Sequence, residues 1–490
     1  MNREELIRNL LLDVNKLMSK KPFTRGCDEW SNSDSGRKVN INGLYVVDTP
    51  NVYENEIKQE DFLKELNPYC HKVLFDENIP SIHQKLSNGS TIEIKTKRTA
   101  INFQEIIKDK QTMHLAAHKM SFTLLNTNPD ETQQNNFITF KQYWELRNQD
   151  GMKYKMVDTQ KSVGDVGLLY YFNYKGEIKS RIISFPDYII CPHNDENGER
   201  LLDSIIYINE EGIKTIDNYD DQYLYRITFD GLDENNNKVW RYHTPLKHGF
   251  NESPLITKRG RVAWDKVQSL IESYEELYNI FIVIQKRWGW GILYVKGKFN
   301  ETAKKIAGNI VLQDTSMDKS GDAKFLTAPS PSGTIDTLNT MYESIQTGSS
   351  TTFILPKDVK TSGDISGIAI QLTQSQDIEL ATKSVIDWQN VADKMTRLFK
   401  YGLSVELVSK GINLNAITEF NQLFISGKFK IWKPFSETEY NNMLISLKQA
   451  GLISTDTGVE ENTISKPDEK NRIKKEEDTK QVIDANINQE

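Results

Sequence analysis

The sequence predicts an α+β fold, because segments with two different hydrophobic periods follow one another along the chain. Between residues 163 and 245, short apolar runs alternate with turns rich in Gly and Asn, a pattern typical of antiparallel strands joined by hairpins. Around 262–286 and 378–399, apolar side chains instead recur every three or four residues, which predicts two long helices. A chain of 490 residues is also long enough for roughly two to four structural units.

The overall charge argues against tight binding of duplex nucleic acid by a broad basic surface. The chain has 61 Lys and Arg residues against 68 Asp and Glu residues, for a formal net charge of −7. A protein that neutralises many phosphates needs an excess of cations on one face. Any contact with nucleic acid is therefore expected to be weak.

Cysteine usage and hydropathy indicate a soluble protein of a reducing compartment. Cys27, Cys70 and Cys191 are far apart and form no CxxC pair, so neither a disulfide framework nor a cysteine zinc site is predicted. Residues 1–20 have the spacing of an amphipathic helix and lack the cleavage site of a signal peptide. No apolar run approaches the roughly 20 residues that span a bilayer, so no membrane contact is expected.

The strand-rich half can be followed run by run. Residues 1 to about 160 mix helical patterns with polar loops and one alternating strand, "STIEIKTK" at 90–97. The strand runs that follow are "VGLLYYF", "IKSRIISF", "SIIYI", "YLYRITF" and "KVWRYH". They are separated by "NYKGE", "DENGE", "NEEG" and "DENNN", each with a Gly or Asn that tolerates the positive φ of a tight turn.

Two helices then bracket a small insert. The first is expected to begin near residue 262 and to end at "RWGWG", where Gly289 and Gly291 interrupt it. The insert, residues 287–330, contains strand-like "ILYVKGK" and "KFLTAP" around a helical "ETAKKIAGNIV". "TIDTLNTMYESIQ" predicts the second helix of the pair.

A stretch rich in Gly, Ser and Thr at 348–367 predicts an exposed loop before the next long helix. Thr373 and Gln376 have the spacing of a capping box at the start of that helix. The heptad-like seam of the helix suits either a short coiled coil or a helix packed on its own domain.

The C-terminal part continues with a strand and a short helix. "KFKIWKPF" has the composition of a strand. Ser436 and Glu439 form a second capping-box pattern, and Gly451 suits the end of the helix that they begin.

Two short motifs have the spacing of metal sites, but each lacks a required ligand. His114 and His118 lie one helical turn apart, yet no metalloprotease glutamate and no third ligand accompany them, so we expect two histidines on a polar helix face. "IEIK" fits half of a metal-dependent nuclease core, with Glu93 as ligand and Lys95 polarising water, if an acid such as Asp76 completes it. An ordinary amphipathic strand accounts for the same residues.

Motifs for nucleotide binding and acyl transfer do not occur in the sequence. There is no GxxxxGK[ST] loop and no GxSxG elbow, so no catalytic residue, cofactor or metal is predicted. Lys258, Arg259 and Arg261, ahead of the first long helix, form a cluster that could contact phosphates, although a solvated helix start has the same composition. This pattern favours a mechanical role over catalysis.

Four stretches, taken in order, are typical of one family. They are "FPDYIICPHNDENGERLLDSIIYI" (185–208), "KHGFNESPLIT" (247–257), "SGDISGIAIQL" (362–372) and "GLISTDTGVEENTISKPDEKNRIKKEEDTK" (451–480). They resemble, respectively, the wing segment, the turn before the first stem helix, the junction of tunnel loop and tunnel helix, and the charged ending of the portal proteins of tailed bacteriophages. The resemblance spans about 185–480 and does not extend to residues 1–160.

The resemblance implies a portal fold with a mixed or antiparallel wing sheet, a long α-helical stem, a small α/β clip, a kinked tunnel helix and a small helical crown. The implied parts are the wing (1–255), stem helix (256–286), clip (287–330), second stem helix (331–350), tunnel loop (351–366), tunnel helix and wing return (367–435), crown (436–465) and charged tail (466–490).

The resemblance also implies a function. Portal proteins form a ring, here expected to hold about twelve copies, at one capsid vertex of the virion, through which the genome is packaged and later ejected. The implied partners are other copies of the chain, double-stranded DNA bound without sequence specificity, the terminase large subunit, the head–tail adaptor, and the major capsid and scaffolding proteins. Assembly would take place in the cytoplasm of the bacterial host.

Two groups of side chains would serve these contacts. Those of the channel loop are Lys357, Asp358, Lys360, Thr361, Ser362 and Asp364, whose two lysines and two aspartates cancel, so that the loop offers no net attraction to DNA. Those expected to dock partners at the clip are Lys296, Lys298, Lys304, Lys305, Lys319 and Lys324, which outnumber four acidic residues between 289 and 330.

Other classes of function stay open at this point. One is a different ring-forming adaptor of the virion, or a generic coiled-coil scaffold. Another is the metal-dependent nuclease built on Glu93 and Lys95, which predicts DNA cleavage abolished by changing either residue.

Overall fold

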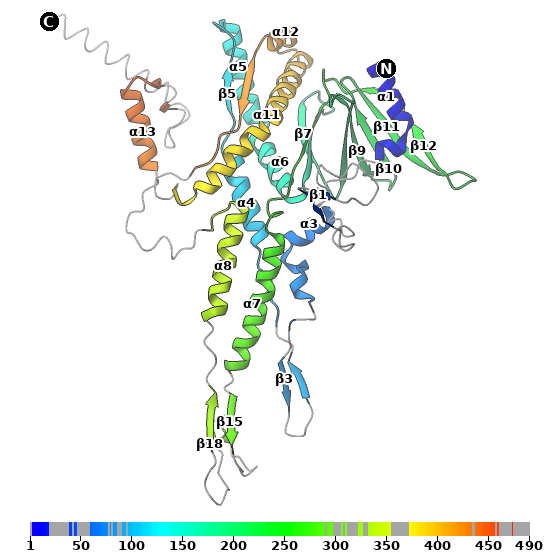
Figure 1. Cartoon of the computed structure of the whole chain (residues 1–490). Helices are drawn as coiled ribbons and strands as arrows, with labels where there is room; N and C mark the ends of the chain where they lie inside the picture. Colours follow the sequence, from blue (N-terminus) through cyan, green and yellow to red (C-terminus); the bar gives the residue numbers. More distant parts are fainter. Residues whose placement is uncertain are drawn as a thin grey trace, which may run out of the picture.

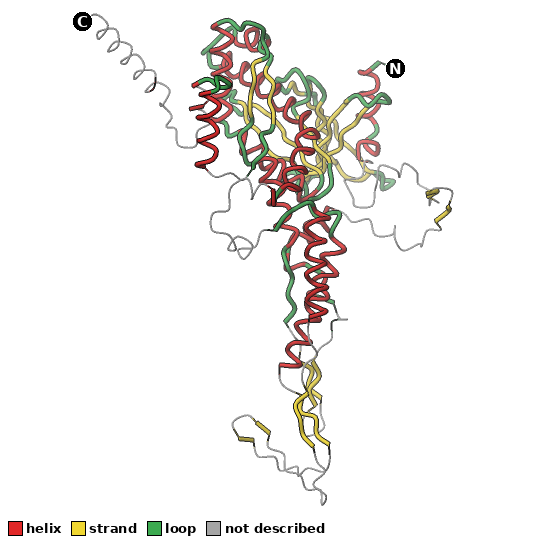
Figure 2. The backbone as a smooth tube through the Cα atoms, turned by 60° about the vertical axis from the view of Figure 1, so that its left-hand side comes forward, coloured by secondary structure: helices red, strands yellow, loops and turns green. Residues whose placement is uncertain are grey.

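The computed structural model of the chain describes residues 2–18, 39–41, 44–46, 59–76, 79, 82–85, 91–94, 97–289, 292–296, 305–306, 309–310, 322–326, 332–353, 372–433, 437–455, 458–459 and 473. A broad head contains the large sheets and most helices, and a narrow stalk of two helices extends from it (Figure 1). Figure 2 shows the same stalk after a turn of the molecule. Helices and antiparallel strand pairs together confirm the predicted α+β class.

The largest sheet lies in the head and is built from consecutive hairpins. Its strands are β8 (Tyr188–Asn194), β9 (Arg200–Ile208), β10 (Lys214–Tyr219), β11 (Tyr223–Leu232), β12 (Lys238–Tyr242) and β13 (Leu246–Lys247). The order is β12-β11-β10-β9-β8, β13 also pairs with β11, and every pairing is antiparallel. Neighbours in sequence therefore pair, as the turn residues predict.

Four hairpin turns of the head share one geometry. The first residue of each accepts, through its side-chain Oδ1, backbone N–H bonds from the residues two and four positions on. The fourth residue has a positive φ, which suits Gly or Asn. These residues are Gly176 (71°), Gly198 (84°), Gly212 (76°) and Asn236 (62°).

A second, three-stranded sheet packs on one face of the first. It has the order β14-β6-β7 and consists of β6 (Asp165–Phe172), β7 (Ile178–Ile183) and β14 (Leu255–Arg259). Leu169, Ile183 and Leu255 from this sheet are buried against Ile190 and Ile205 from the larger one. The sequence predicted one hairpin-linked sheet over 163–245, and the structure divides it after β7.

The opposite face of the larger sheet is covered by the N-terminal helices α1 (Arg3–Leu12) and α2 (Val14–Met18). Ile7, Val14 and Leu17 are buried there, which explains the amphipathic pattern. One helix was predicted, but the structure has two. The break falls at Asp13, whose Oδ1 accepts a hydrogen bond from the backbone N–H of Lys16 and so caps the second helix.

The main core of the head is mostly helical and also takes buried residues from β6, β7 and β14. It contains α4 (Phe103–Ala116), α5 (Glu131–Leu146), α6 (Gln149–Val163), α11 (Ser375–Ser409) and α12 (Ala416–Asn421), with the strand pair β5 (Ser121–Leu124) and β19 (Ile425–Lys428). The seam of α11, which includes Trp388 and Phe399, is buried among these elements. The heptad-like pattern therefore reflects packing on the chain's own domain.

The stalk is formed by α7 (Gln268–Gly289) and α8 (Ser332–Ser349), which run side by side (Figures 1 and 2). The short elements α3 (Gln59–Leu66), η1 (Pro68–Cys70) and η2 (Lys72–Leu74) lie beside its upper part. Beyond the stalk, β15 (Ile292–Lys296) pairs with β18 (Asp322–Leu326). Three small hairpin pairs are also described: β1 (Val39–Ile41) with β2 (Leu44–Val46), β3 (Ile82–Lys85) with β4 (Thr91–Ile94), and β16 (Lys305–Ile306) with β17 (Asn309–Ile310).

Several predicted boundaries are wrong. The helix expected to begin near 262 begins at Gln268, because the preceding residues form turns that bury Trp264. The segment "ETAKKIAGNIV", predicted as a helix, contains the antiparallel β16–β17 pair. Gly308 lies between these two strands in the sequence, and glycine is unfavourable in the interior of a helix.

The C-terminal part of the head needs similar corrections. α11 begins after Gln374, so this residue and not Thr373 stands at its N-cap, and the side chain of Gln374 makes no capping hydrogen bond. The strand expected in "KFKIWKPF" lies earlier in the chain, in β19, because Ile425–Lys428 are the residues that pair with β5. α13 (Glu437–Gln449) ends as predicted, with Gly451 at φ 70°.

Candidate functional site

The stalk joins the head at a junction of four segments: the end of α6, the turns between β14 and α7, the end of α8, and the first half of α11. Backbone hydrogen bonds hold the turns against α6. Gly260 N–H donates to Gly164 O at 2.9 Å, and Ala263 N–H donates to Lys161 O at 2.9 Å. The start of the stalk therefore has a fixed position on the head.

A buried polar network secures α7 below this junction. His71 Nδ1 lies 2.8 Å from Glu275 Oε1, and His71 Nε2 lies 2.8 Å from Glu65 O. Trp264 Nε1 donates to Glu65 Oε2 at 2.8 Å, and Ile101 N–H donates to Glu275 Oε1 at 2.6 Å. Burial acts to lower the pKa of His71, but the hydrogen bonds and charge of its partners outweigh burial and raise it above its ordinary value.

The described ends of the segment 354–371 are both attached to the head. Gln111 Nε2, on α4, donates to Ser349 O at 3.0 Å, at the end of α8. Thr352 N–H donates to the carboxylate of Asp377, at the start of α11, at 3.1 and 3.2 Å. The end of α8 and the start of α11 are therefore held close together.

The basic cluster predicted from the sequence is divided by the structure. Each of its three cations is paired with its own carboxylate, and for Lys258 and Arg259 that carboxylate comes from another segment of the chain. The pairs are Lys258–Asp387 at 2.7 Å (Nζ to Oδ1), Arg259–Asp165 at 2.8 and 2.9 Å (Nε to Oδ1 and Nη2 to Oδ2), and Arg261–Asp265 at 3.9 Å (Nε to Oδ2). Lys258 and Arg261 face a common pocket, whereas Arg259 does not line it.

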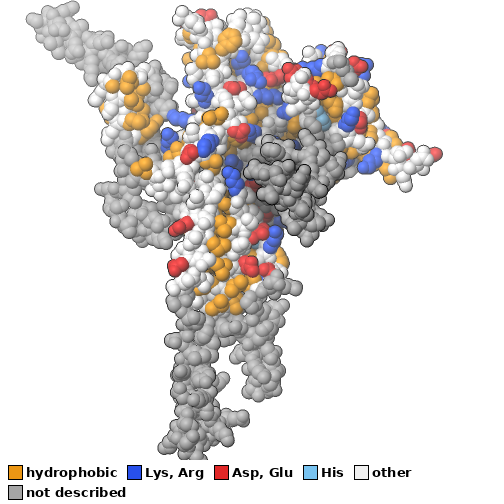
Figure 3. Space-filling model, in the orientation of Figure 1, with side chains coloured by type: hydrophobic (Ala, Val, Ile, Leu, Met, Phe, Trp, Pro, Cys, Tyr) orange, Lys and Arg blue, Asp and Glu red, His pale blue; other side chains and the backbone are white. Residues whose placement is uncertain are grey.

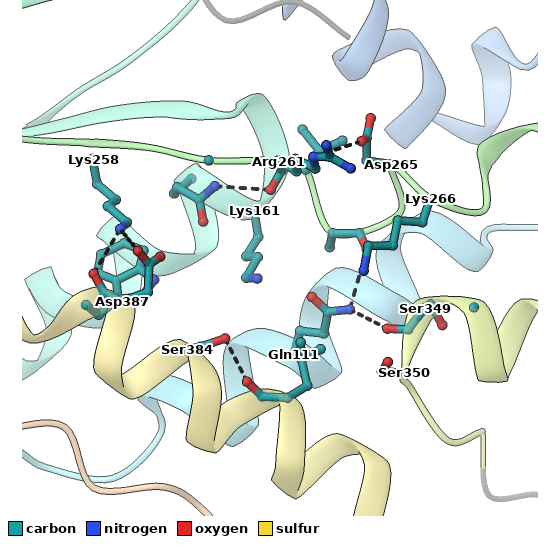
Figure 4. A pocket seen from close by; sticks show the side chains of 17 residues that line it. Gln111, Lys161, Lys258, Arg261, Asp265, Lys266, Ser349, Ser350, Ser384 and Asp387 are labelled. Atoms are coloured by element: carbon teal, nitrogen blue, oxygen red, sulfur yellow. Dashed lines mark hydrogen bonds and ion pairs between the residues drawn. The ribbon is translucent and has the colours of Figure 1, made fainter. Parts of the chain in front are cut away.

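The pocket lies inside the junction and has a volume of about 170 Å³. Lys161, Lys258, Arg261 and Lys266 supply four cations to its lining, against two carboxylates from Asp265 and Asp387. Figure 4 shows Lys161 extending into the space between the Lys258–Asp387 pair and the side chains of Lys266 and Gln111.

Lys161 and Lys266 are the cations of this site that the sequence analysis did not single out. Burial lowers the pKa of Lys161 to about 8, with Lys258 and Lys266 acting in the same direction and Asp387 opposing them. The pocket around Lys161 is lined by residues as far as Trp388, 227 positions away in sequence, so no local pattern could have shown the cluster.

The other predicted site residues cannot be placed by side chain. The channel-loop residues Lys357, Asp358, Lys360, Thr361, Ser362 and Asp364 lie outside the described residues, as do Lys298, Lys304 and Lys319. Lys296, Lys305 and Lys324 occupy positions in β15, β16 and β18. Ser436 of the second capping-box pattern and Cys27 are likewise outside the described part of the chain.

The prediction that His114 and His118 share a polar helix face is wrong. His114 is buried on α4, and its Nδ1 lies 3.1 Å from Trp432 O. Residues 429–433 return over this helix, and the ring of Trp432 meets that of His114 edge-on at 5.1 Å. Burial lowers the pKa of His114. His118 lies beyond the end of α4, which is at Ala116.

The side chains of the nuclease-like triplet lie outside what the structure describes. Glu93 belongs to β4, opposite His83 of β3, and Lys95 is outside the described residues. Across the part of the chain that the structure describes, no three His, Cys, Asp or Glu residues are grouped as a metal site would require. No described helix combines the length and apolar content needed to cross a bilayer.

Comparison with known proteins identifies the family. No curated protein sequence matches the chain. A family model described as "Phage portal protein, SPP1 Gp6-like" matches residues 49–482, nearly the whole chain. This range is wider than the 185–480 over which the sequence stretches suggested a resemblance, and it includes much of the N-terminal region. The chain therefore belongs to the SPP1 Gp6-like family of phage portal proteins.

Proposed function

We propose that about twelve copies of the chain form a ring at one capsid vertex, and that its central channel carries DNA during packaging and ejection. Family membership already gives the chain a portal role as a structural component of the phage capsid. The ring would assemble in the cytoplasm of the bacterial host before the capsid is filled.

The observation that best supports a ring is the surface of the stalk. Figure 3 shows a stripe of hydrophobic side chains that runs along it. Ile284 on α7 and Ile335 on α8 are each 41% exposed. An apolar stripe on a narrow stalk is costly in water, and stalks placed side by side around one axis would cover it.

In this proposal, α7 and α8 are the stem, β15 and β18 belong to the clip, and the larger sheet belongs to the wing. The loop that contains Lys357, Asp358, Lys360 and Asp364 would point into the channel. Because its charges cancel, it would contact DNA without holding it, as passage of any sequence requires.

The clip is proposed as the docking surface for the terminase large subunit and later for the head–tail adaptor. Its lysines Lys296, Lys298, Lys304, Lys305, Lys319 and Lys324 give it an excess of positive charge. The wing and crown would face the major capsid and scaffolding proteins.

Shortening the loop tests the channel assignment. A deletion within 356–364 should leave ring assembly intact and reduce the amount of DNA packaged, because only the contact with DNA is changed. Normal packaging by rings that lack this segment would contradict the assignment of the loop.

Charge changes at the clip test the docking assignment. Replacing Lys319 and Lys324 by Gln should weaken capture of the terminase large subunit in a pull-down. Lys383→Gln, a change on the exposed side of α11 in the head, is the matched control and should leave capture unchanged. Equal capture by both variants would contradict docking through these lysines.

A further inference from the structure

The pocket between stalk and head has a marked excess of positive charge for a protein whose net charge is −7. Its lining contributes four cationic side chains and two carboxylates, which leaves two positive charges without a matching negative charge inside the pocket. Lys258 is neutralised by Asp387, since its Nζ lies 2.7 Å from Oδ1. The uncompensated charge therefore lies mainly with Lys161 and Lys266.

Lys161 has an environment that is unfavourable for an ammonium group. Its side chain is partly buried, and among the described residues its Nζ makes no hydrogen bond and no ion pair. Asp387, the nearby carboxylate, is already bonded to Lys258. An ammonium group removed from water normally acquires an anionic partner, so the pocket is incomplete as it stands.

The remaining lining suits an oxyanion. Ser350 contributes a hydroxyl group to the lining. Ser384 also lines the pocket, but its hydroxyl donates to Leu380 O at 2.8 Å within α11. Gln111 holds the end of α8 in place through its bond to Ser349 O. The volume of about 170 Å³ corresponds to several water molecules at about 30 Å³ each, which is room for a tetrahedral oxyanion. A phosphate group carries one to two negative charges near neutral pH and accepts several hydrogen bonds, which matches the excess charge.

We propose that this pocket, which we name the junction pocket, binds a phosphate group through Lys161, Lys266 and Arg261. The phosphate belongs either to the DNA backbone or to a free oxyanion. The first source rests on the proposed function, because the pocket adjoins the end of α8 and the first half of α11, on either side of the loop assigned to the channel. Phosphate binding itself does not depend on ring formation.

The pH dependence of binding follows from the groups that face Lys161. These are Lys258, Lys266 and Arg261 among the cations, and Asp265 and Asp387 among the carboxylates. Because the pKa of Lys161 is lowered to about 8, its ammonium form is lost between roughly pH 7 and 9. Phosphate binding should weaken over the same interval, and bound phosphate should raise the pKa of Lys161.

The experiment uses the full-length chain, with inorganic phosphate as the probe and the thermal unfolding midpoint and calorimetry as readouts. Phosphate should raise the midpoint of the wild type and of the control Lys383→Gln by the same amount. It should bind Lys161→Gln at least about tenfold more weakly. Without phosphate, Lys161→Gln should unfold at or above the wild-type temperature, because the substitution removes a desolvated charge.

Two further probes identify the source of the phosphate and the competing ligand class. Short duplex DNA that displaces phosphate from the wild type assigns the site to the DNA backbone, and failure to displace it assigns the site to a free oxyanion. Phosphate binding by Lys161→Gln equal to that of the wild type would overturn the proposal. Acetate that stabilises the wild type as strongly as phosphate would also overturn it, in favour of a carboxylate from a protein partner.

The outcome can be separated from that of the proposed function. A chain that binds phosphate in a Lys161-dependent way but forms no ring would leave the junction pocket standing and remove only DNA as its source. A chain that forms rings without binding phosphate would overturn the junction pocket as a phosphate site and leave the proposed portal function standing.

Discussion

His71 and Glu275, 204 residues apart in sequence, form a buried hydrogen bond of 2.8 Å between Nδ1 and Oε1, and each side chain is only 3% exposed. Both ring nitrogens of His71 face acceptors, the carboxylate of Glu275 and the carbonyl of Glu65. This arrangement favours the doubly protonated, charged imidazole. The network holds α7, in the part of the stalk next to the head, against the α3–η2 segment.

Stability should therefore depend on pH through His71. Its pKa in the folded state is raised above 6.5, so its contribution is fully present below pH 6.5 and is lost as pH rises through the raised value. We expect the free energy of unfolding to fall over that interval. Chemical denaturation of the wild type and of His71→Gln across pH 5.5–8.5 measures this, and the variant should lose the dependence.

His243→Gln is the matched control, because His243 is exposed and, among the described hydrogen bonds, its imidazole ring bonds only to Thr228 Oγ1. It should keep the wild-type pH profile. If the pH profile of His71→Gln is identical to that of the wild type, His71 does not contribute to the pH dependence of stability.

The C-terminal half of α11 contains a buried carboxylate whose loss should be costly. Glu406 is fully buried, with Oε1 at 2.6 Å from Arg147 and 2.8 Å from Lys410, and Oε2 accepting from the N–H of Ile178 at 2.9 Å. Glu406→Gln leaves Arg147 without its closest counter-charge, which should cost roughly 3 kcal/mol in the free energy of unfolding.

The same helix supplies the comparison for Glu406. Glu379→Gln removes an exposed carboxylate that pairs with Lys383 at 2.7 Å, and should leave the denaturation midpoint unchanged within error. If the two substitutions change the free energy of unfolding equally, the buried position of Glu406 does not make its charge more important for stability.

The shared turn geometry predicts a position-specific effect of glycine replacement. Gly198 has a φ of 84°, and no atom lies within 4 Å of the position that a Cβ would occupy, so Gly198→Ala should cost about 1 kcal/mol through backbone strain alone. Gly333→Ala, also with free space but inside a helix, should be neutral or stabilising. Thermal denaturation of both variants provides the test, and a neutral Gly198→Ala would contradict it.

The apolar stripe of the stalk predicts an assembly defect. Ile335→Asp places a charge on a surface that other copies are expected to cover, so ring yield should fall while the circular dichroism spectrum stays unchanged. Tyr174→Asp changes a side chain that is 92% exposed in a hairpin turn of the head, and should leave ring yield as in the wild type. Full ring yield from Ile335→Asp would contradict burial of this part of α8 between copies.

Much of the fold could be predicted from local patterns. The hairpins followed from Gly and Asn at turn positions such as Gly198 and Gly212, whose positive φ is a local requirement. The division into two sheets could not be predicted, because it depends on β14, which pairs with β6 from about 90 residues away. The start of α7 was displaced because burial of Trp264 overrides the helical period before Gln268.

The site was less predictable than the fold. Lys258 and Arg261 could be singled out because they are close in sequence, but their pairing with Asp387 and Asp265 could not. Lys161 carries no local signal, and His114 was expected on a polar face because the segment that buries it, near Trp432, returns 318 residues later. Contacts between distant segments determine which charged groups share a pocket.

Electron microscopy of the purified full-length chain and of vertices in assembled capsids tests the central claim most directly. We expect class averages of a ring with a central hole and about twelve subunits. Averages without a central pore, from preparations in which the capsid vertices are occupied, would contradict it.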